Sequence, residues 1–184
     1  SDGAGNSVAD SFVVTVVPVA DTPSVSNAAT AEDTQTSSGL VINRNAVDGS
    51  EVTHFKPTAI AGGTLYQNDG TSQIASGDFI TVAQGNAGLK FTPSLNSEVS
   101  GSFSVQASTS NNSSGLGGSV VTATITVSAV NDAPTLSGGP YALSATDEDT
   151  TSGGTLVSAI LSGLAYGDVD SGAVSGIAVT AKTG

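Results

Sequence analysis

The sequence contains no cysteine, methionine or tryptophan, and it has only 4 lysine and arginine residues against 16 aspartate and glutamate residues. Without cysteine, neither a disulfide nor a thiolate metal site can form. The net charge of −12 excludes the basic patch that nucleic-acid binding requires and disfavours attachment to an anionic membrane surface. No apolar run approaches the roughly 18 residues of a membrane-spanning helix. A core or a bound cation must therefore stiffen this protein.

A short phrase occurs twice in the chain. Val19-Ala20-Asp21-Thr22-Pro23 returns about one domain length later as Val130-Asn131-Asp132-Ala133-Pro134. Each copy follows an alternating run rich in valine, isoleucine and threonine, and each precedes an acidic pair, Glu32-Asp33 and Glu148-Asp149. A tandem array of similar units is the simplest explanation, with the phrase at the joints between units.

Signals for helices are nearly absent, and β-branched residues alternate with small polar ones between glycine and asparagine turns. The pattern predicts an all-β fold, an immunoglobulin-like Greek-key sandwich with an aliphatic core that includes Phe91 and Phe103. The predicted strands are residues 24–28, 40–43, 54–61, 64–67, 79–82, 89–92, 101–108 and 120–130.

The repeat divides the chain into one complete unit and two partial ones. We expect residues 1–20 to be the closing strand of a preceding unit, 21–131 a complete unit and 132–184 the N-terminal part of a following unit. Residues 7–17 align with 118–128, and strands are expected at 156–161 and 177–181. Incomplete units expose apolar faces, so neighbouring chains could exchange strands, the tail of one accepting the N-terminal strand of another. The alternative is that the two ends do not exchange between chains in solution.

Carboxylates gather around the second joint. Asp132 lies in the linker, and Asp168-Val169-Asp170-Ser171-Gly172 forms a loop in the unit beyond it. Several charged oxygen ligands and a glycine at a sharp turn are what Ca²⁺ requires. The loop is not an EF-hand, because Val179 stands where that motif needs glutamate.

These motifs resemble the cadherin-like repeats of large bacterial surface adhesins of the VCBS and RTX-adhesin type. The resemblance covers all three units and is carried by Val130-Asn131-Asp132-Ala133-Pro134-Thr135, Asp147-Glu148-Asp149, Gly167-Asp168-Val169-Asp170-Ser171-Gly172 and the stretch from Phe91 to Ala107. It implies a secreted or cell-surface protein whose tandem sandwiches, a cadherin-like fold, hold an adhesive tip away from the cell. Its partners would be the neighbouring repeats, with Ca²⁺ at their joints.

The resemblance also implies a ligand set for Ca²⁺ at the second joint. One role falls to Glu32 or Asp33, one to Glu98, the linker role to Asp132, and the last to Asp168 with Asp170. Glu98 is the only acidic residue of its loop, where cadherins have several. Weaker candidates are Asp21 and Asp48 at the first joint, where Ala46 replaces one of the paired aspartates, and Glu148 and Asp149, which would serve a following joint.

Other interpretations of these residues stay open. Asp and Asn before Pro are ordinary turn starters, and residues 168–172 could form a plain solvated turn. A module that binds a glycan or a protein partner is the alternative function, with Tyr66 and Tyr141 as candidate contacts. No nucleophile elbow or phosphate loop is present, and the single histidine, His54, begins a predicted strand, so we do not expect an enzyme.

Overall fold

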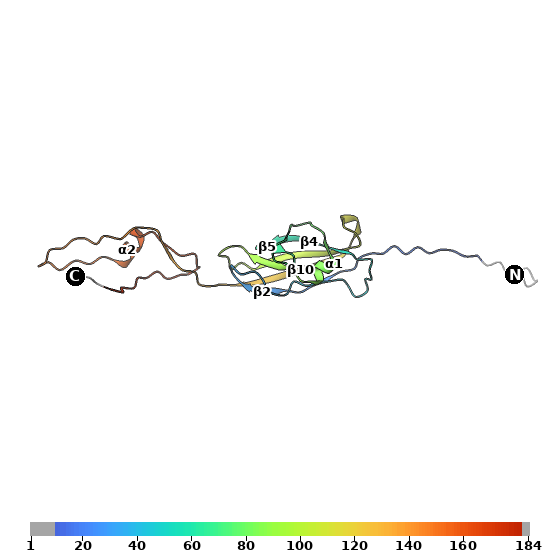
Figure 1. Ribbon diagram of the computed structural model, residues 1–184, viewed down its shortest axis with the longest axis horizontal. Helices are drawn as coiled ribbons and strands as arrows, with labels where there is room; N and C mark the ends of the chain where they lie inside the picture. Colours follow the sequence, from blue (N-terminus) through green and yellow to red (C-terminus); the bar gives the residue numbers. More distant parts are fainter. Residues whose placement is uncertain (1–9, 182–184) are drawn as a thin grey trace, which may run out of the picture.

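The computed structural model describes residues 10–181. A β-rich unit lies between an extended N-terminal segment and a C-terminal tail with little regular structure (Figure 1). The described residues are mostly β and form several sheets, and they also contain two short α-helices. The all-β prediction is thus confirmed in its main feature, with the helices as exceptions.

The larger sheet has five strands in the order β2-β10-β9-β4-β7. They are β2 (Ala28–Ala31), β10 (Leu116–Ser128), β9 (Gly101–Ser108), β4 (His54–Ala61) and β7 (Ile80–Thr81). The strand β2 pairs with β10 in parallel, whereas the other neighbours are antiparallel. The parallel pairing brings residue 31 beside residue 128, so the turn after β2 lies next to the start of the linker.

A second sheet contains β6 (Gln73–Ile74), β5 (Gly63–Tyr66) and β8 (Lys90–Pro93), and β1 (Ser24–Val25) pairs with β3 (Ile42–Asn43). The two sheets meet across an apolar core. Phe91 of β8 is fully buried, and its ring lies so close to Gly101 of β9 that a Cβ there would be 2.3 Å from the ring. The core also contains Phe103, as predicted, together with Val105 and Ala107 of β9 and Ala123 and Ile125 of β10.

Two short helical elements lie between strands of this unit. The helix α1 (Val82–Asn86) lies between the predicted strands 79–82 and 89–92 and takes Val82 from the first of them. A 3-10 helix, η1 (Ser113–Gly115), precedes β10. Thr81 and Gln84 form a reciprocal capping box at the start of α1. Gly85 of this helix lies against the ring of Phe55, and a side chain there would overlap the ring.

The two segments predicted to be partial units contain fewer strands than expected. Residues 10–17 form no strand and their large side chains are exposed, with Phe12 at 87%; residues 1–9 lie outside the described part. In the tail, β11 (Thr135–Leu136) pairs with β12 (Tyr166–Gly167), as β1 pairs with β3. The predicted strand at 156–161 is wrong: residues Val157–Gly163 form helix α2. Residues 177–181 also form no strand.

The reasons for these differences are physical. A strand needs a hydrogen-bonding partner, and no described strand pairs with residues 10–17 or 177–181. In α2 the apolar residues Ile160, Leu161 and Leu164 recur at helical spacing, and the helix buries Leu161. The strand was predicted by alignment of the tail with the complete unit, and a short apolar segment of this kind does not distinguish a helix from a strand.

Candidate metal site at the second joint

The acidic turn after β2 supplies a buried carboxylate. Glu32 is 4% exposed, and its backbone N–H donates to Ser128 O at 2.9 Å, which continues the pairing of β2 with β10. Its Oε1 accepts the backbone N–H of Val130 at 2.7 Å. The parallel pairing of β2 with β10 therefore directs Glu32 at the linker.

A loop of the tail supplies two further carboxylates. Asp170 follows β12 and accepts the backbone N–H of Asp132 through Oδ2 at 2.8 Å. Asp168 accepts the N–H of Asp170 through Oδ1 at 3.1 Å and the hydroxyl of Tyr166 through Oδ2 at 3.0 Å. The loop is thus shaped by its own aspartates, and it contacts the linker through Asp170.

Three carboxylates converge between these segments. Glu32, Asp132 and Asp170 each offer an oxygen within 4.8 Å of the others. Asp132 Oδ2 is buried and has no hydrogen-bond partner. An orphaned buried carboxylate oxygen is costly unless a cation or a proton compensates it. This partly buried acidic triad could hold a metal ion, and the unsatisfied oxygen fits that role.

The electrostatics of the triad point the same way. Burial raises the pKa of Asp132 above its ordinary value, and the nearby carboxylates of Asp170, Asp33, Glu32 and Asp168 raise this pKa further. Burial and then the hydrogen bond to Asp168 raise the pKa of Tyr166, so its hydroxyl stays protonated and donates. The site concentrates negative charge, which a divalent cation would neutralise.

Two other predicted ligands lie outside the triad. Asp33, at φ +56°, accepts the backbone N–H of Asn96 through Oδ1 at 2.8 Å. Asp33 thereby holds the loop that contains Glu98, whose own side chain is exposed and does not belong to the triad. The triad therefore combines three of the six main candidates. Asp168 contacts it through the backbone N–H of Asp170, whereas Asp33 is engaged by Asn96.

The first joint repeats one contact of the second. The backbone N–H of Asp21 donates to Asp48 Oδ1 at 3.1 Å, as that of Asp132 donates to Asp170. The matching strand pairs lead into loops of different charge, because Arg44 comes directly after β3 whereas Asp168 comes directly after β12. The Arg44 guanidinium donates to backbone carbonyls of its own loop, including Val52 O at 3.3 Å.

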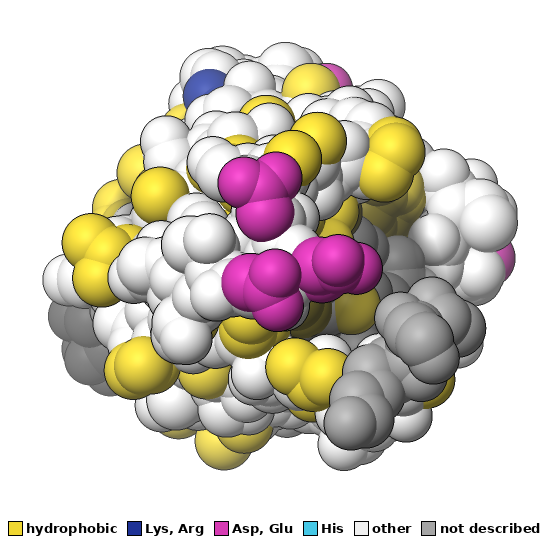
Figure 2. Space-filling model, turned by 90° about the vertical axis from the view of Figure 1, so that its left-hand side faces the viewer, with side chains coloured by type: hydrophobic (Ala, Val, Ile, Leu, Met, Phe, Trp, Pro, Cys, Tyr) yellow, Lys and Arg dark blue, Asp and Glu magenta, His cyan; other side chains and the backbone are white. Residues whose placement is uncertain are grey.

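The turn of the tail also repeats that of the complete unit. Thr146 Oγ1 donates to Thr150 O at 2.9 Å, as Thr30 Oγ1 donates to Thr34 O at 2.8 Å. Glu148 and Asp149 therefore occupy the positions of Glu32 and Asp33 in an equivalent turn, but both are exposed. The view onto the tail side of the molecule shows acidic side chains gathered among hydrophobic ones (Figure 2).

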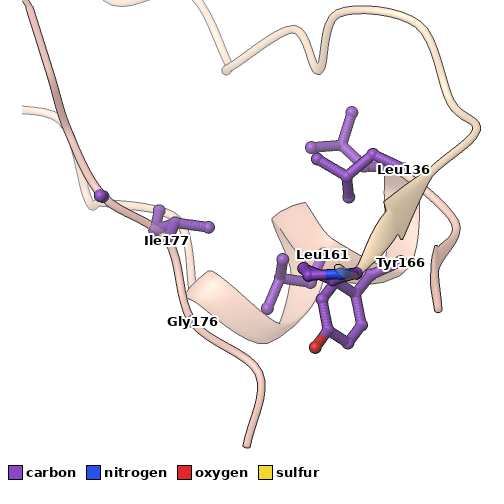
Figure 3. Close-up of a pocket in the computed structure, with 8 residues that line it drawn as sticks. Leu136, Leu161, Tyr166, Gly176 and Ile177 are labelled. Carbon is purple, nitrogen blue, oxygen red and sulfur yellow. The ribbon is translucent and has the colours of Figure 1, made fainter. Parts of the chain in front are cut away.

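An apolar groove lies beside the acidic loop in the tail (Figure 3). Leu161 of α2 and Tyr166 of β12 face it, together with Leu136 and Ile177. Tyr166 thus belongs to both the groove and the loop. Sequence reasoning missed this tyrosine, although its position two residues before Asp168 was the available signal.

The residues considered for other functions lie apart from the triad. His54 starts β4, and its Nδ1 lies 2.8 Å from the hydroxyl of Thr53. Tyr66 ends β5, and the Tyr141 ring packs against Gly163.

Comparison with known proteins finds no matching family model, no similar curated protein and no similar solved structure. Among residues 10–181, no helix has the length and apolar character needed to cross a membrane.

Proposed function

We propose that this chain is part of an extracellular bacterial adhesin, in which tandem cadherin-like sandwiches act as an extender and Ca²⁺ stiffens their joints. The convergence of Glu32, Asp132 and Asp170 carries the proposal, because each residue comes from a different side of the joint. Glu32 belongs to the complete unit, Asp132 to the linker and Asp170 to the tail.

The fold supports this proposal independently of the site. An early strand, β2, pairs in parallel with the last strand, β10, in a sheet that packs on a second sheet across an apolar core, and this supports an immunoglobulin- or cadherin-like sandwich. The pairing of β11 with β12 and the repeated turn at Thr146 support a second copy of the same unit after the linker.

The geometry indicates how an ion would stiffen the joint. Without an ion, three carboxylates within 4.8 Å repel one another and favour separation of the linker from its neighbours. A hard cation that takes oxygens from all three would replace this repulsion by attraction, and Ca²⁺ suits a site built only of oxygen ligands. Bending of one unit against the other would then break metal–oxygen bonds.

The test is calorimetric titration of the whole chain with Ca²⁺, together with small-angle scattering in Ca²⁺ and in chelator. We expect one bound ion, a higher melting temperature by linkage and a narrower distribution of interatomic distances. Asp170→Asn is the informative variant and should abolish all three effects, whereas Asp69→Asn, in a turn of the complete unit, should leave them unchanged. If titration to millimolar Ca²⁺ gives neither a heat of binding nor a higher melting temperature, the metal-stiffened joint is refuted.

A further inference from the structure

Asp168 is already engaged inside its own loop. Its Oδ1 accepts the backbone N–H two residues ahead, at Asp170, which is the geometry of an Asx turn. Its Oδ2 accepts the Tyr166 hydroxyl at 3.0 Å. Both oxygens already accept a hydrogen bond within the loop, and Asp168 is not one of the three carboxylates that converge.

Tyr166 is itself held in place by the tail. It pairs opposite Leu136 in the β11–β12 ladder, is half-buried, and lines the apolar groove with Leu161 (Figure 3). Its hydroxyl therefore has a position that the small sheet determines. The matching residue at the first joint, Ile42 opposite Val25, has no hydroxyl group, so this contact distinguishes the second joint from the first.

A continuous series of contacts leads from this tyrosine to the triad. Tyr166 donates to Asp168, Asp168 accepts from the backbone of Asp170, and Asp170 accepts from the backbone of Asp132. Each step uses a carboxylate oxygen to fix the next part of the chain. The last step leaves Asp170 beside Glu32 and Asp132.

We infer that Tyr166 and Asp168 are positioning residues, which shape the loop so that Asp170 can bind the ion, and that Asp168 is not itself a ligand. This inference rests on the calcium site proposed above. It departs from the simple interpretation of the Asp-x-Asp motif, in which both aspartates chelate one ion. Residues that orient metal ligands through hydrogen bonds commonly change metal affinity by about 10- to 100-fold when removed.

The test compares Ca²⁺ affinities of variants of the whole chain. Asp168→Asn keeps an oxygen that can accept the Asp170 N–H and places an amide N–H where it can donate to the Tyr166 hydroxyl. We therefore expect it to weaken binding only about as much as the matched control Asp33→Asn. Asp33 and Asp168 both act electrostatically on Asp132, so each variant removes one nearby charge. Asp168→Ala breaks the turn and should weaken binding about tenfold or more. Tyr166→Phe should weaken it about tenfold or more, the effect of losing one hydrogen bond to a charged group.

A second measurement needs no metal. The chain has 3 tyrosines and no tryptophan, so Tyr66→Phe with Tyr141→Phe leaves Tyr166 as the sole emitter. A carboxylate that accepts the tyrosine hydroxyl quenches its emission, and in this background Asp168→Ala should increase the emission in chelator. Unchanged emission would show that the Tyr166–Asp168 contact is absent. It would overturn this inference and leave the proposed calcium site untouched.

The remaining outcomes are also decisive. If Asp168→Asn weakens binding as severely as Asp170→Asn, while Asp33→Asn does not, Asp168 is a ligand and the inference is wrong although the calcium joint stands. If Asp168→Ala binds like the unaltered chain, the positioning role is wrong. Failure of the unaltered chain to bind Ca²⁺ would overturn the proposed function, and the inference with it.

Discussion

Glu32 contacts the linker backbone in this structure, and the calcium site proposed above gives it a second, separable role as a ligand. Its Oε1 accepts the Val130 N–H at 2.7 Å, and it also belongs to the acidic triad. Glu32→Gln keeps a side-chain oxygen for Val130 and removes the charge. Glu32→Ala removes both. The pair of variants therefore separates the structural contribution from the metal contribution.

The expected loss of stability depends on how deeply the Glu32 side chain is buried. Glu32 is 4% exposed and its contact with Val130 is part-buried, so loss of the acceptor leaves an N–H without a partner. Such a loss costs about 1–3 kcal/mol. For a domain of about 100 residues this corresponds to a fall in melting temperature of roughly 5–15 °C. In chelator, Glu32→Ala should show this fall, whereas Glu32→Gln should melt at or above the temperature of the unaltered chain, because repulsion within the triad is relieved.

Calorimetric melting of the three proteins in chelator and in saturating Ca²⁺ provides the assay. Both variants should lose most of the stabilisation by Ca²⁺, which for the unaltered chain is about 2.7 kcal/mol at 100 times the dissociation constant. Equal melting of the alanine and glutamine variants in chelator would refute the contribution of the Val130 contact. A full response of Glu32→Gln to Ca²⁺ would show that the Glu32 charge is not needed for binding.

Three further predictions test other parts of the structure. The pKa of Asp132 is raised in the folded state, so the stability of the metal-free protein should fall as pH rises from about 3.8, the pKa in the unfolded chain, through the raised pKa of the folded state. Melting temperatures measured across this pH range should show the fall, and Asp132→Asn should remove it. Gly101→Ala should destabilise the core by about 1–3 kcal/mol, since its methyl group would lie 2.3 Å from the Phe91 ring; Gly139→Ala, with nothing within 4 Å, should be neutral in the same denaturant titration. The exposed Phe12 and the apolar groove of the tail lead us to expect strand exchange between chains. The mass measured by sedimentation should therefore rise with protein concentration, and Val14→Asp should prevent the rise. A strict monomer at all concentrations would contradict this expectation.

The strands that the sequence predicts best are long and bury alternate residues. The predicted bounds of β4 and β9 match those observed, because both strands pair over most of their length and alternate between core and surface. The strand β2 was not predicted as a separate element, since its four residues Ala28–Ala31 are small and its partner β10 lies at the other end of the unit. Pairing between distant segments is a tertiary effect that local alternation does not contain.

The candidate site, like the fold, was predictable from the sequence only in part. Sequence reasoning selected the acidic turn, the linker aspartate and the Asp-x-Asp loop, because charge and turn residues are visible locally. It did not indicate which carboxylate of each pair faces the joint. That choice depends on backbone hydrogen bonds: Asn96 engages Asp33 and leaves Glu32 to the linker, and the Asx turn engages Asp168 and leaves Asp170 to the linker.

The two joints share a backbone contact but differ in their charged groups. Comparing them therefore shows which residues order the linker and which could bind a metal ion. Asp48 and Asp170 each accept the N–H of a linker aspartate, so both joints hold the linker to a loop of the following unit through this contact. At the second joint the contact uses Asp170 Oδ2, and Glu32 approaches from the preceding unit. A linker that is already ordered by hydrogen bonds loses less conformational entropy when an ion binds. The aspartate contact would therefore prepare a joint for a cation, and the carboxylate from the preceding unit would decide whether the cation binds.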